Sequence, residues 1–434
     1  MRKIFQYILM AVAVVATASC SNELDETLQP AGNGNLQFVV SDFPTFGEDA
    51  QTRVIGTQDE GKTAWADGDN ILVHLYSEKY GDQAVTLTFD AENNTWESDD
   101  VTLSYLENET PTITAVYAPD CEIKSDKTIG LLEGKQYGET EYIPAKTTIS
   151  GNTLDIRFES GRTYSRLRIA GLANQTLTVT TTDFTPAGAT EVATAAYTLI
   201  TDNNGNAFLY GVFAEDATVS VKQGDITLKD YTFSAEKNPN GTEHNKSYAL
   251  DATPVIDGTL GGKAEATEDD ITALVEQLKG YVDNGITTII VPGSEPAMID
   301  VGSLTITAIG EAIYRLSKEE SYDGKIDLIL PDVTEIVDQE FDGAHALNSI
   351  NLPKVTIVGD GAFYDCQYLE ELTFGSVVTA INHNTRAEFH RVGEKVEGCD
   401  LVLNREQVNA EADYQPNIET RTWWNTEWKS ITLK

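Results

Sequence analysis

The 434-residue chain carries 69 acidic and 30 basic side chains, which gives a formal net charge of −39. A surface of that sign repels phosphate backbones, so we expect no nucleic-acid partner. Hydrophobic residues make up 41% of the chain, enough for the cores of several domains. The acidic residues are spread along the sequence, which is typical of a soluble, self-repelling surface.

Residues 1–19 have the pattern of a secretory signal peptide. Arg2-Lys3 precede an apolar stretch that is too short for a stable membrane span, and Cys20 stands where cleavage is expected. This arrangement resembles the lipobox of bacterial lipoproteins, which implies that Cys20 is lipidated and anchors the chain in the outer membrane. Thr17 departs from the leucine of that motif, and cleavage without lipidation is the alternative.

Residues 20–35 are expected to form a lipidated tether. The acidic stretch 21–26 resembles the export signal by which Bacteroidetes lipoproteins reach the outer face of the outer membrane. That resemblance implies exposure at the cell surface, and the alternative is a solvated acidic spacer. Pro30, Gly32 and Gly34 then interrupt any regular element.

The chain from residue 36 to residue 252 shows short runs of period-two alternation. Such runs, rich in Val, Ile and Thr, predict strands with one buried face. Turn sequences such as Asp67-Gly68 and Asn203-Asn204-Gly205 separate them, and the pattern favours antiparallel β-sandwiches. The clearest predicted strands cover residues 70–76, 84–89, 111–117, 165–170, 176–180 and 217–221.

One string in this region has a family likeness. Thr52-Arg53 is followed by the Trp- and Asp-containing string 63–73, and Tyr117-Ala118-Pro119 and 245–250 come later in the chain. Together they resemble the fimbrillin-like family of Bacteroidetes fimbrial subunits. The resemblance implies tandem transthyretin-like β-sandwiches, which we place at residues 36–160 and 161–252.

The same resemblance makes Arg53 a candidate processing site. Family pilins assemble by strand donation after a protease cuts behind an arginine and removes the first strand, a form of β-augmentation. Arg53 is the only arginine between Arg2 and Arg157. The alternative is that Arg53 is an ordinary strand or turn residue.

Asp67 and Asp69 are two closely spaced carboxylates beside Trp65. Trp65 is expected to close one end of the core, with both carboxylates in solvent. Calcium binding by Asp67 and Asp69 is the alternative, but the loop lacks the further ligands that such a site needs.

Residues 253–265 are Gly-rich and are expected to form a linker. The string faintly resembles a phosphate loop, but Ala264 stands where Ser or Thr is required, so we reject that function. Thr267 then caps a predicted helix that ends at about Leu278 and covers the start of the last domain, residues 266–434.

An internal repeat follows. The string 330–336 recurs as 352–358, 22 residues on, and Phe341 recurs as Phe363. The string 361–369 resembles the BspA-type leucine-rich repeat, which implies a short solenoid of stacked turns. The predicted fold class is therefore mainly β: tandem β-sandwiches, then a leucine-rich-repeat solenoid with a capping helix.

The ends of the repeat region depart from its pattern. Residues 304–310 are interpreted as a worn copy, and Lys325 and Glu340 replace the expected Leu and Ala of the first full repeat. The tail 422–431 holds three tryptophans. It is interpreted as a C-terminal cap, with a sugar-stacking platform as the alternative.

Nothing in the sequence has the pattern of a catalytic centre. The five histidines have no metal-ligand spacing, and no nucleophile elbow, zincin motif or dinucleotide fingerprint is present. Cys121, Cys366 and Cys399 are interpreted as buried apolar residues, with a Cys366–Cys399 disulfide as the alternative. We therefore expect no enzyme activity, no catalytic residue, no metal site and no cofactor.

These features predict a surface lipoprotein that acts as an adhesin through its leucine-rich repeats. The partner would be a host protein or a glycan, bound by solvent-facing strand residues or loops that the sequence does not identify. One alternative is a fimbrial tip subunit, joined to other fimbrial subunits after cleavage at Arg53. Another is a polysaccharide-processing enzyme or an accessory glycan-binding protein.

Overall fold

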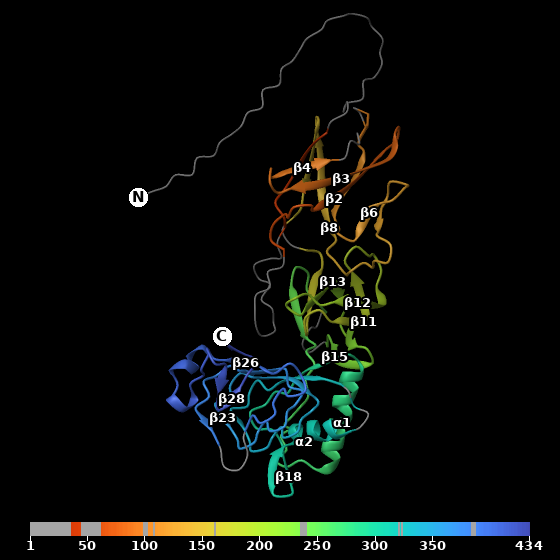
Figure 1. Ribbon diagram of the computed structural model, residues 1–434. Coiled ribbons are helices and arrows are strands. Elements are labelled where there is room, and N and C mark those ends of the chain that lie inside the picture. Colours follow the sequence, from red (N-terminus) through yellow and green to blue (C-terminus); the bar gives the residue numbers. More distant parts are fainter. Residues whose placement is uncertain are drawn as a thin grey trace, which may run out of the picture.

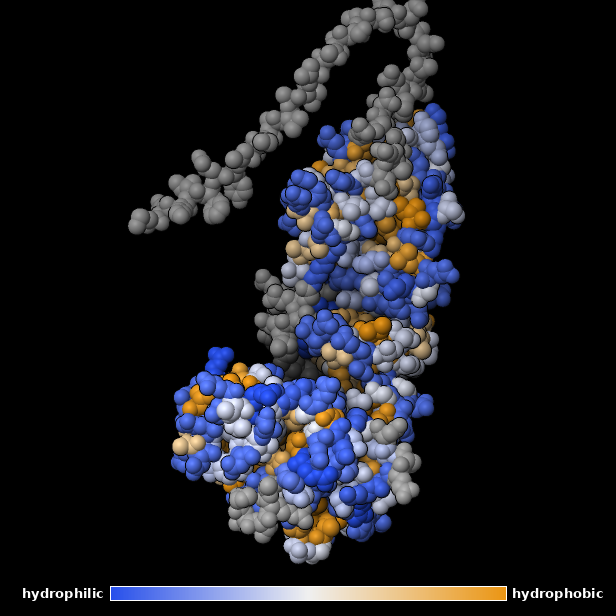
Figure 2. Space-filling view, in the orientation of Figure 1, coloured by the Kyte–Doolittle hydropathy of each residue, from blue (hydrophilic) through white to orange (hydrophobic). Residues whose placement is uncertain are grey.

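Three β-rich parts follow one another along the molecule, with the first sheet at one end and the C-terminal part at the other (Figure 1). The computed structural model describes residues 36–44, 62–98, 103–106, 109–159, 162–234, 241–319, 322, 324–382 and 388–434. Strands dominate these residues, so the protein is mainly β. The face seen in Figure 2 is largely hydrophilic, with apolar side chains in small separate groups.

The first part is one folded path of strands around a single core. β8 pairs with β5 through its first residues and with β9 through its last, so it connects the two layers. Val73, Leu87 and Ile156 are fully buried between them. A separate hairpin joins β6 (Cys121–Ile123) and β7 (Ile129–Leu131). The order is β1 (Gln37–Val40), β9 (Thr153–Arg157), β8 (Ile143–Ser150), β5 (Thr112–Tyr117), β2 (Asn70–Ser77), β3 (Gly81–Asp90) and β4 (Thr95–Ser98).

The second part repeats this construction. β11 pairs with β14 up to Thr181 and with β13 from Phe184, so the bend in β11 closes the layers over a stack of phenylalanines. Phe184 and Phe213 lie 4.3 Å apart, and Phe213 and Phe233 lie 4.8 Å apart. The order is β15 (Ile226–Thr232), β14 (Thr218–Gln223), β11 (Thr176–Pro186), β13 (Asn206–Phe213), β10 (Ser165–Ala170) and β16 (Ser247–Asp251), with β12 (Ala193–Ile200) on β11. All six strand predictions listed for the first two parts are confirmed.

The C-terminal part contains two parallel sheets wound from the same stretch of chain. Contacts such as Lys354 to Asp332 and Asp360 to Asp338 join residues that are 22 positions apart. The larger sheet has the order β17 (Thr288–Ile290), β20 (Ile326–Ile329), β22 (Leu347–Leu352), β24 (Glu371–Phe374), β26 (Asp400–Leu403) and β29 (Ser430–Leu433). The smaller one contains β21 (Glu335–Ile336), β23 (Ile357–Val358) and β25 (Ala380–Ile381).

A ladder of aromatic rings fills this coil. Phe341 and Phe363 stack at 5.7 Å, and Phe363 and Phe389 stack at 5.9 Å. Trp428, at 5.3 Å from Phe389, and Trp423, at 5.6 Å, end the ladder. A single turn of chain cannot bury its own apolar face, so each ring is covered by the next turn.

Two α-helices of the described residues cover the start of the coil. α1 (Glu268–Asp283) begins with the predicted cap, because Thr267 and Asp270 form a capping box, but it continues beyond Leu278. The prediction of a worn repeat copy at residues 304–310 is wrong. Its first half is β19 (Leu304–Thr307), antiparallel to β18 (Met298–Val301), and its second half begins α2 (Ala308–Lys318).

The remaining short elements lie near the C-terminus. They are β27 (Thr422–Trp423), β28 (Thr426–Glu427) and the 3₁₀ helices η1 (Arg405–Asn409) and η2 (Ala412–Tyr414). Trp424 and Asn425 both have positive φ, at 48° and 57°, which makes the tight turn of the β27–β28 hairpin.

The predicted linker is packed against the C-terminal part. Ile256 is fully buried in its core and Val255 bridges to Ile290. On the second part, Asp225 N donates to Asn284 Oδ1 at 2.7 Å, at the end of α1. Gly224 is required there, because its φ is +56° and an added Cβ would lie 2.3 Å from Asn284 Oδ1.

Candidate functional site

The outward side chains of the larger parallel sheet form a largely polar surface, here called the strand face. Register places the side chains of each row next to one another on successive strands. The strand face consists of Asp327, Ser349, Glu371, Asp400 and Ser430 in one row and of Asn351, Thr373 and Thr432 in the next, where the apolar Ile329 and the buried Val402 interrupt the polar row.

Alternation along each strand separates this surface from the core. Leu328, Ile350, Leu372 and Leu401 point inward and are almost completely buried, whereas the neighbouring residues of the strand face are half-buried or exposed. Adjacent strands are about 4.8 Å apart. An extended ligand that crosses the strands would therefore meet an equivalent side chain at regular intervals.

The strand face is rich in carboxylates and hydroxyls. Asp327 accepts hydrogen bonds from Ser349 Oγ at 2.7 Å and from Asn348 Nδ2 at 2.9 Å. Ser430 Oγ donates to Asp400 Oδ1 at 2.6 Å, and Thr373 Oγ1 donates to a Glu371 oxygen at 3.1 Å. Side chains ordered in this way are suited to hydrogen bonding with a polyhydroxyl or basic ligand.

Aromatic and cationic groups border the strand face at the amino-terminal ends of its strands. Lys325, just before β20, places its ammonium 4.1 Å from the ring centroid of Tyr368, just before β24. His345, just before β22, lies 5.6 Å from the same ring. Burial lowers the pKa of the Lys325 ammonium. This border adds a flat, half-buried ring to the polar surface.

The C-terminal tryptophans divide between two roles. Trp423 and Trp428 are core residues, with 1% and 2% of their surface exposed, so they cannot form a sugar platform. Trp424 is half-buried, stacks on Tyr414 at 5.2 Å with parallel rings, and donates its Nε1–H to Glu388 at 2.9 Å. The tail therefore packs over the end of the coil.

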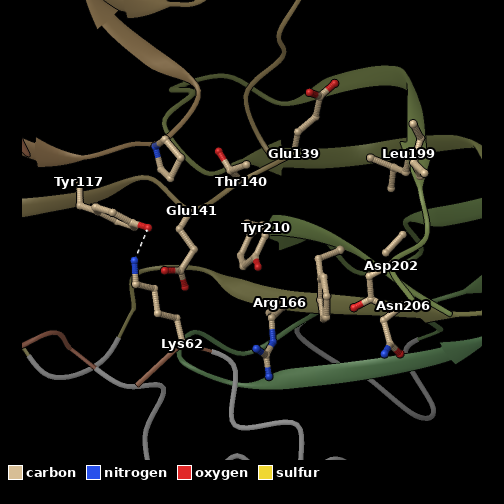
Figure 3. A pocket seen from close by; sticks show the side chains of 14 residues that line it. Lys62, Tyr117, Glu139, Thr140, Glu141, Arg166, Leu199, Asp202, Asn206 and Tyr210 are labelled. Carbon is tan, nitrogen blue, oxygen red and sulfur yellow. Dashed lines mark hydrogen bonds between the residues drawn. The ribbon is translucent and has the colours of Figure 1, made fainter. Parts of the chain in front are cut away.

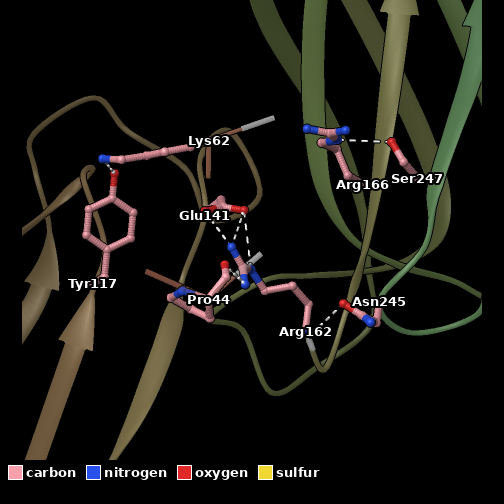
Figure 4. A network of polar contacts seen from close by, with 8 residues as sticks. All are labelled: Pro44, Lys62, Tyr117, Glu141, Arg162, Arg166, Asn245 and Ser247. Carbon is pink, nitrogen blue, oxygen red and sulfur yellow. Dashed lines mark hydrogen bonds and ion pairs between the residues drawn. The ribbon is translucent and has the colours of Figure 1, made fainter. Parts of the chain in front are cut away.

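The junction between the first two parts is built around a buried ion pair (Figure 4). The side chain of Arg162 is 0% exposed and donates to both Glu141 oxygens, at 3.1 and 3.2 Å. It also donates to the carbonyl of Pro44 at 2.5 Å, while its backbone N–H donates to Asn245 at 3.0 Å. Burial raises the pKa of Glu141, and the Arg162 guanidinium opposes that rise.

A cavity of about 380 Å³ lies beside this junction. Lys62 and Tyr117 from the first part face Arg166 and Tyr210 from the second, and Glu141 lies between them (Figure 3). Lys62 Nζ donates to Tyr117 Oη at 2.9 Å and also pairs with Asp69. The cavity mixes charged and aromatic groups, so it is suited to small polar molecules.

Trp65 and its neighbouring aspartates have structural partners. The Trp65 ring packs edge-on against Phe43 at 4.8 Å and donates its Nε1–H to the Ser41 carbonyl at 2.9 Å. Asp67 accepts from Ala91 N at 3.1 Å, while Asp69 is paired with Lys62. Within the residues that the structure describes, no group of three or more His, Cys, Asp or Glu side chains could hold a metal ion.

The three cysteines among the described residues are free and buried. The Cys366–Cys399 disulfide is therefore not formed in this structure. Cys366 donates to the Phe341 carbonyl at 3.0 Å inside the coil, and burial raises the pKa of both thiols. Burial also raises the pKa of Cys121 to about 11. High thiol pKa values mean little reactive thiolate.

Cys20 and Arg53, the two sites predicted from sequence, lie outside the described residues. In the part of the chain that is described, neither helix is both long and apolar enough to cross a membrane. The Arg162–Glu141 pair was not predicted, because its members are 21 residues apart and nothing local in the sequence relates them.

Comparison with known proteins gives limited likeness. No protein-family model matches the chain, and no curated protein matches its sequence. A solved structure of a putative cell adhesion protein from Bacteroides fragilis is similar with a TM-score of 0.25 and 10% identity, over 50% of this chain and 93% of that one. A fimbrial protein from Bacteroides ovatus is similar with a TM-score of 0.25 and 8% identity, over 51% of this chain and 48% of that one. The chain thus spans about half the length of the Bacteroides ovatus protein.

Proposed function

We propose that this chain is a lipid-anchored cell-surface adhesin whose strand face binds a host glycan or host protein. The observation that carries the proposal is the strand face itself, in which equivalent polar positions are aligned on consecutive parallel strands. Such repetition is suited to a ligand that is itself extended and repeating.

The arrangement of the three parts supports this function. The first sheet, which is nearest to the N-terminal anchor in sequence, lies at one end of the molecule, and the strand face belongs to the part at the other end (Figure 1). An anchor at Cys20 would leave the C-terminal part as the head of a stalk made of two β-sandwiches.

The coil supports classification of the head as a leucine-rich repeat of the BspA type. Its turns repeat every 22 residues between the first two stacked phenylalanines, and Leu, Ile and Phe fill the inward positions. In repeat proteins of this kind the exposed strand surface is an extended binding surface. The head would thus bind its ligand without catalysing a reaction on it.

The strand face is tested by reversing one charge at its centre. Glu371→Arg should lower binding at least tenfold on an array of host and plant glycans and immobilised matrix proteins, because the exposed Glu371 lies mid-row. Glu276→Arg, on the exposed side of α1, is the matched control and should bind like the wild type. Equal binding by Glu371→Arg and the wild type, with both proteins folded, would refute the assignment.

A fimbrial tip subunit is the second candidate, and the position of β1 favours it. β1 lies at the edge of the first sheet, in parallel register with β9, and Phe38 and Val40 pack on the core. A cut after Arg53 would release β1 and open a groove along β9 for a strand from another subunit. β16 is paired with β10 in its own sheet and continues into the head, so the chain has no free C-terminal strand to donate among its described residues.

Mass spectrometry of the mature protein from intact cells separates the two candidates. A chain that begins at acylated Cys20 and is digested by external protease supports the anchored adhesin. A chain that begins at Val54 without lipid supports the tip subunit and rules out the anchored form.

A further inference from the structure

A second cavity lies at the start of the coil, away from the strand face. It has a volume of about 230 Å³ and is enclosed by the loop after β17, the β18–β19 hairpin, the first turn of α2 and the segment around β21. Most of its wall is apolar, including Val291, Pro296, Met298, Ile309, Leu330 and Ile336. Apolar cavities of about 150 Å³ are large enough to bind benzene.

One wall of this cavity carries a buried carboxyl group. Glu340 is 3% exposed and accepts hydrogen bonds from the backbone N–H and the hydroxyl of Thr307, which also lines the cavity. An added Cβ on Gly310 would lie 2.5 Å from Glu340 Oε1, so the carboxyl rests against the first turn of α2. Both donors on Thr307 are neutral groups.

The titratable side chains among the described lining residues of the cavity are all acidic. Among its described lining residues, Glu335 and Glu340 are the titratable groups and there is no lysine, arginine or histidine. On α2, Arg315 pairs with both Glu311 and Glu268, so its charge is already shared between two carboxylates. Burial raises the pKa of Glu340 to about 7, although the hydrogen bonds from Thr307 lower it in part. A buried carboxylate without a cation is costly, and a cationic ligand would offset that cost.

We propose that this cavity binds a small amine, with the ammonium group on Glu340 and an apolar body against the surrounding aliphatic side chains. The apolar walls would pack against the body of the ligand. The Glu340 carboxyl beside Thr307 would bind its ammonium group. The site is independent of the strand face and of the proposed adhesin function. The ammonium source is either a free amine or a lysine side chain of a partner protein.

The full-length protein is tested by calorimetry with benzylamine, and with benzyl alcohol as the uncharged probe of the same shape. We expect benzylamine to bind at least tenfold more tightly than benzyl alcohol. Because the ammonium favours the ionised carboxyl, binding at pH 6 should release a proton to the buffer and binding at pH 9 should release none. Equal affinities for the two probes, or no binding of benzylamine at millimolar concentration, would overturn the proposal.

Variants locate the site. Glu340→Gln should lower benzylamine affinity at least tenfold and abolish the proton release, and Met298→Phe should block both probes by filling the cavity. Asp300→Asn, an exposed carboxyl on β18 outside the cavity, is the control that should bind normally. Unchanged binding by Glu340→Gln contradicts the assignment, and if that variant does not fold, Met298→Phe and the probe pair still decide it. Tighter binding of Nα-acetyl-lysine amide than of benzylamine would assign the source to a partner's lysine.

Discussion

Buried charged side chains lie where parts of this chain are held together. Arg162 and Glu141 join the first two parts, while Glu340 joins the coil to α2 through Thr307. Neither interaction has a local signal in the sequence, because Thr307 and Glu340 are 33 residues apart. Sequence patterns identified Glu340 only as a departure from its repeat, and its partner became visible only in three dimensions.

Glu340 should make the stability of the coil depend on pH. Its folded-state pKa of about 7 exceeds its ordinary value of 4.5, so between these values the folded state retains a proton that the unfolded state loses. The free energy of unfolding should therefore fall as pH rises, by about 3 kcal/mol in total at 1.36 kcal/mol per pKa unit.

Glu340→Gln should remove this dependence. Urea unfolding of both proteins at pH 4.5, 6 and 8, followed by tryptophan fluorescence, measures it, because three of the five tryptophans lie in the C-terminal part. The variant should gain stability relative to the wild type as pH rises. Parallel pH profiles would show that Glu340 ionises normally.

Helices and strands with a short, regular sequence period were predicted correctly, whereas elements were missed where that period changes. Period-two alternation located the strands of the first two parts, and the 22-residue spacing located Phe341 and Phe363. The third ring, Phe389, was missed because more residues separate it from Phe363. α2 was missed because its first residues imitate a repeat, although Ile309, Ala312, Ile313 and Leu316 have helical spacing.

The inward row of the larger sheet should be intolerant of charge. Leu352 is fully buried at the end of β22, so Leu352→Asp places an unpaired carboxylate in the core and should unfold the coil, at a cost above about 4 kcal/mol. Asn351→Asp makes the same charge on the outward side of the same strand and is the control. Thermal melts should show loss of one transition in the first variant only. A native melt for Leu352→Asp would mean that this strand faces the other way.

The contacts of Arg162 join the first two parts of the protein. Arg162 contacts Glu141, the Pro44 carbonyl and Asn245, which come from distant parts of the chain. Loss of one member of a buried ion pair typically costs about 3–5 kcal/mol. The other member is then left charged and without its partner.

Arg162→Ala should therefore loosen the joint between the first two parts. Small-angle scattering should show a broader distribution of maximum dimensions, and the melting transition of the first two parts should move to lower temperature. Arg157→Ala is the matched control, because Arg157 pairs with Asp155 at a site where its side chain is 72% exposed, and exposed pairs contribute little. Identical scattering from both variants would show that other contacts hold the junction.

The residue that precedes each stacked phenylalanine differs between the ends and the middle of the ladder. Glu340 and Glu388 hold this position at the two ends of the ladder and bind Thr307 and Trp424, whereas Ala362 holds it in the middle and is fully buried. At this position the two end turns thus bind the structures that cover the ladder, whereas the middle turn has only a small buried side chain. Duplicating residues 347–368 in frame would add one strand to each parallel sheet and one ring to the ladder while both ends kept their contacts. The length of the coil is accordingly a property that gene duplication could change one turn at a time.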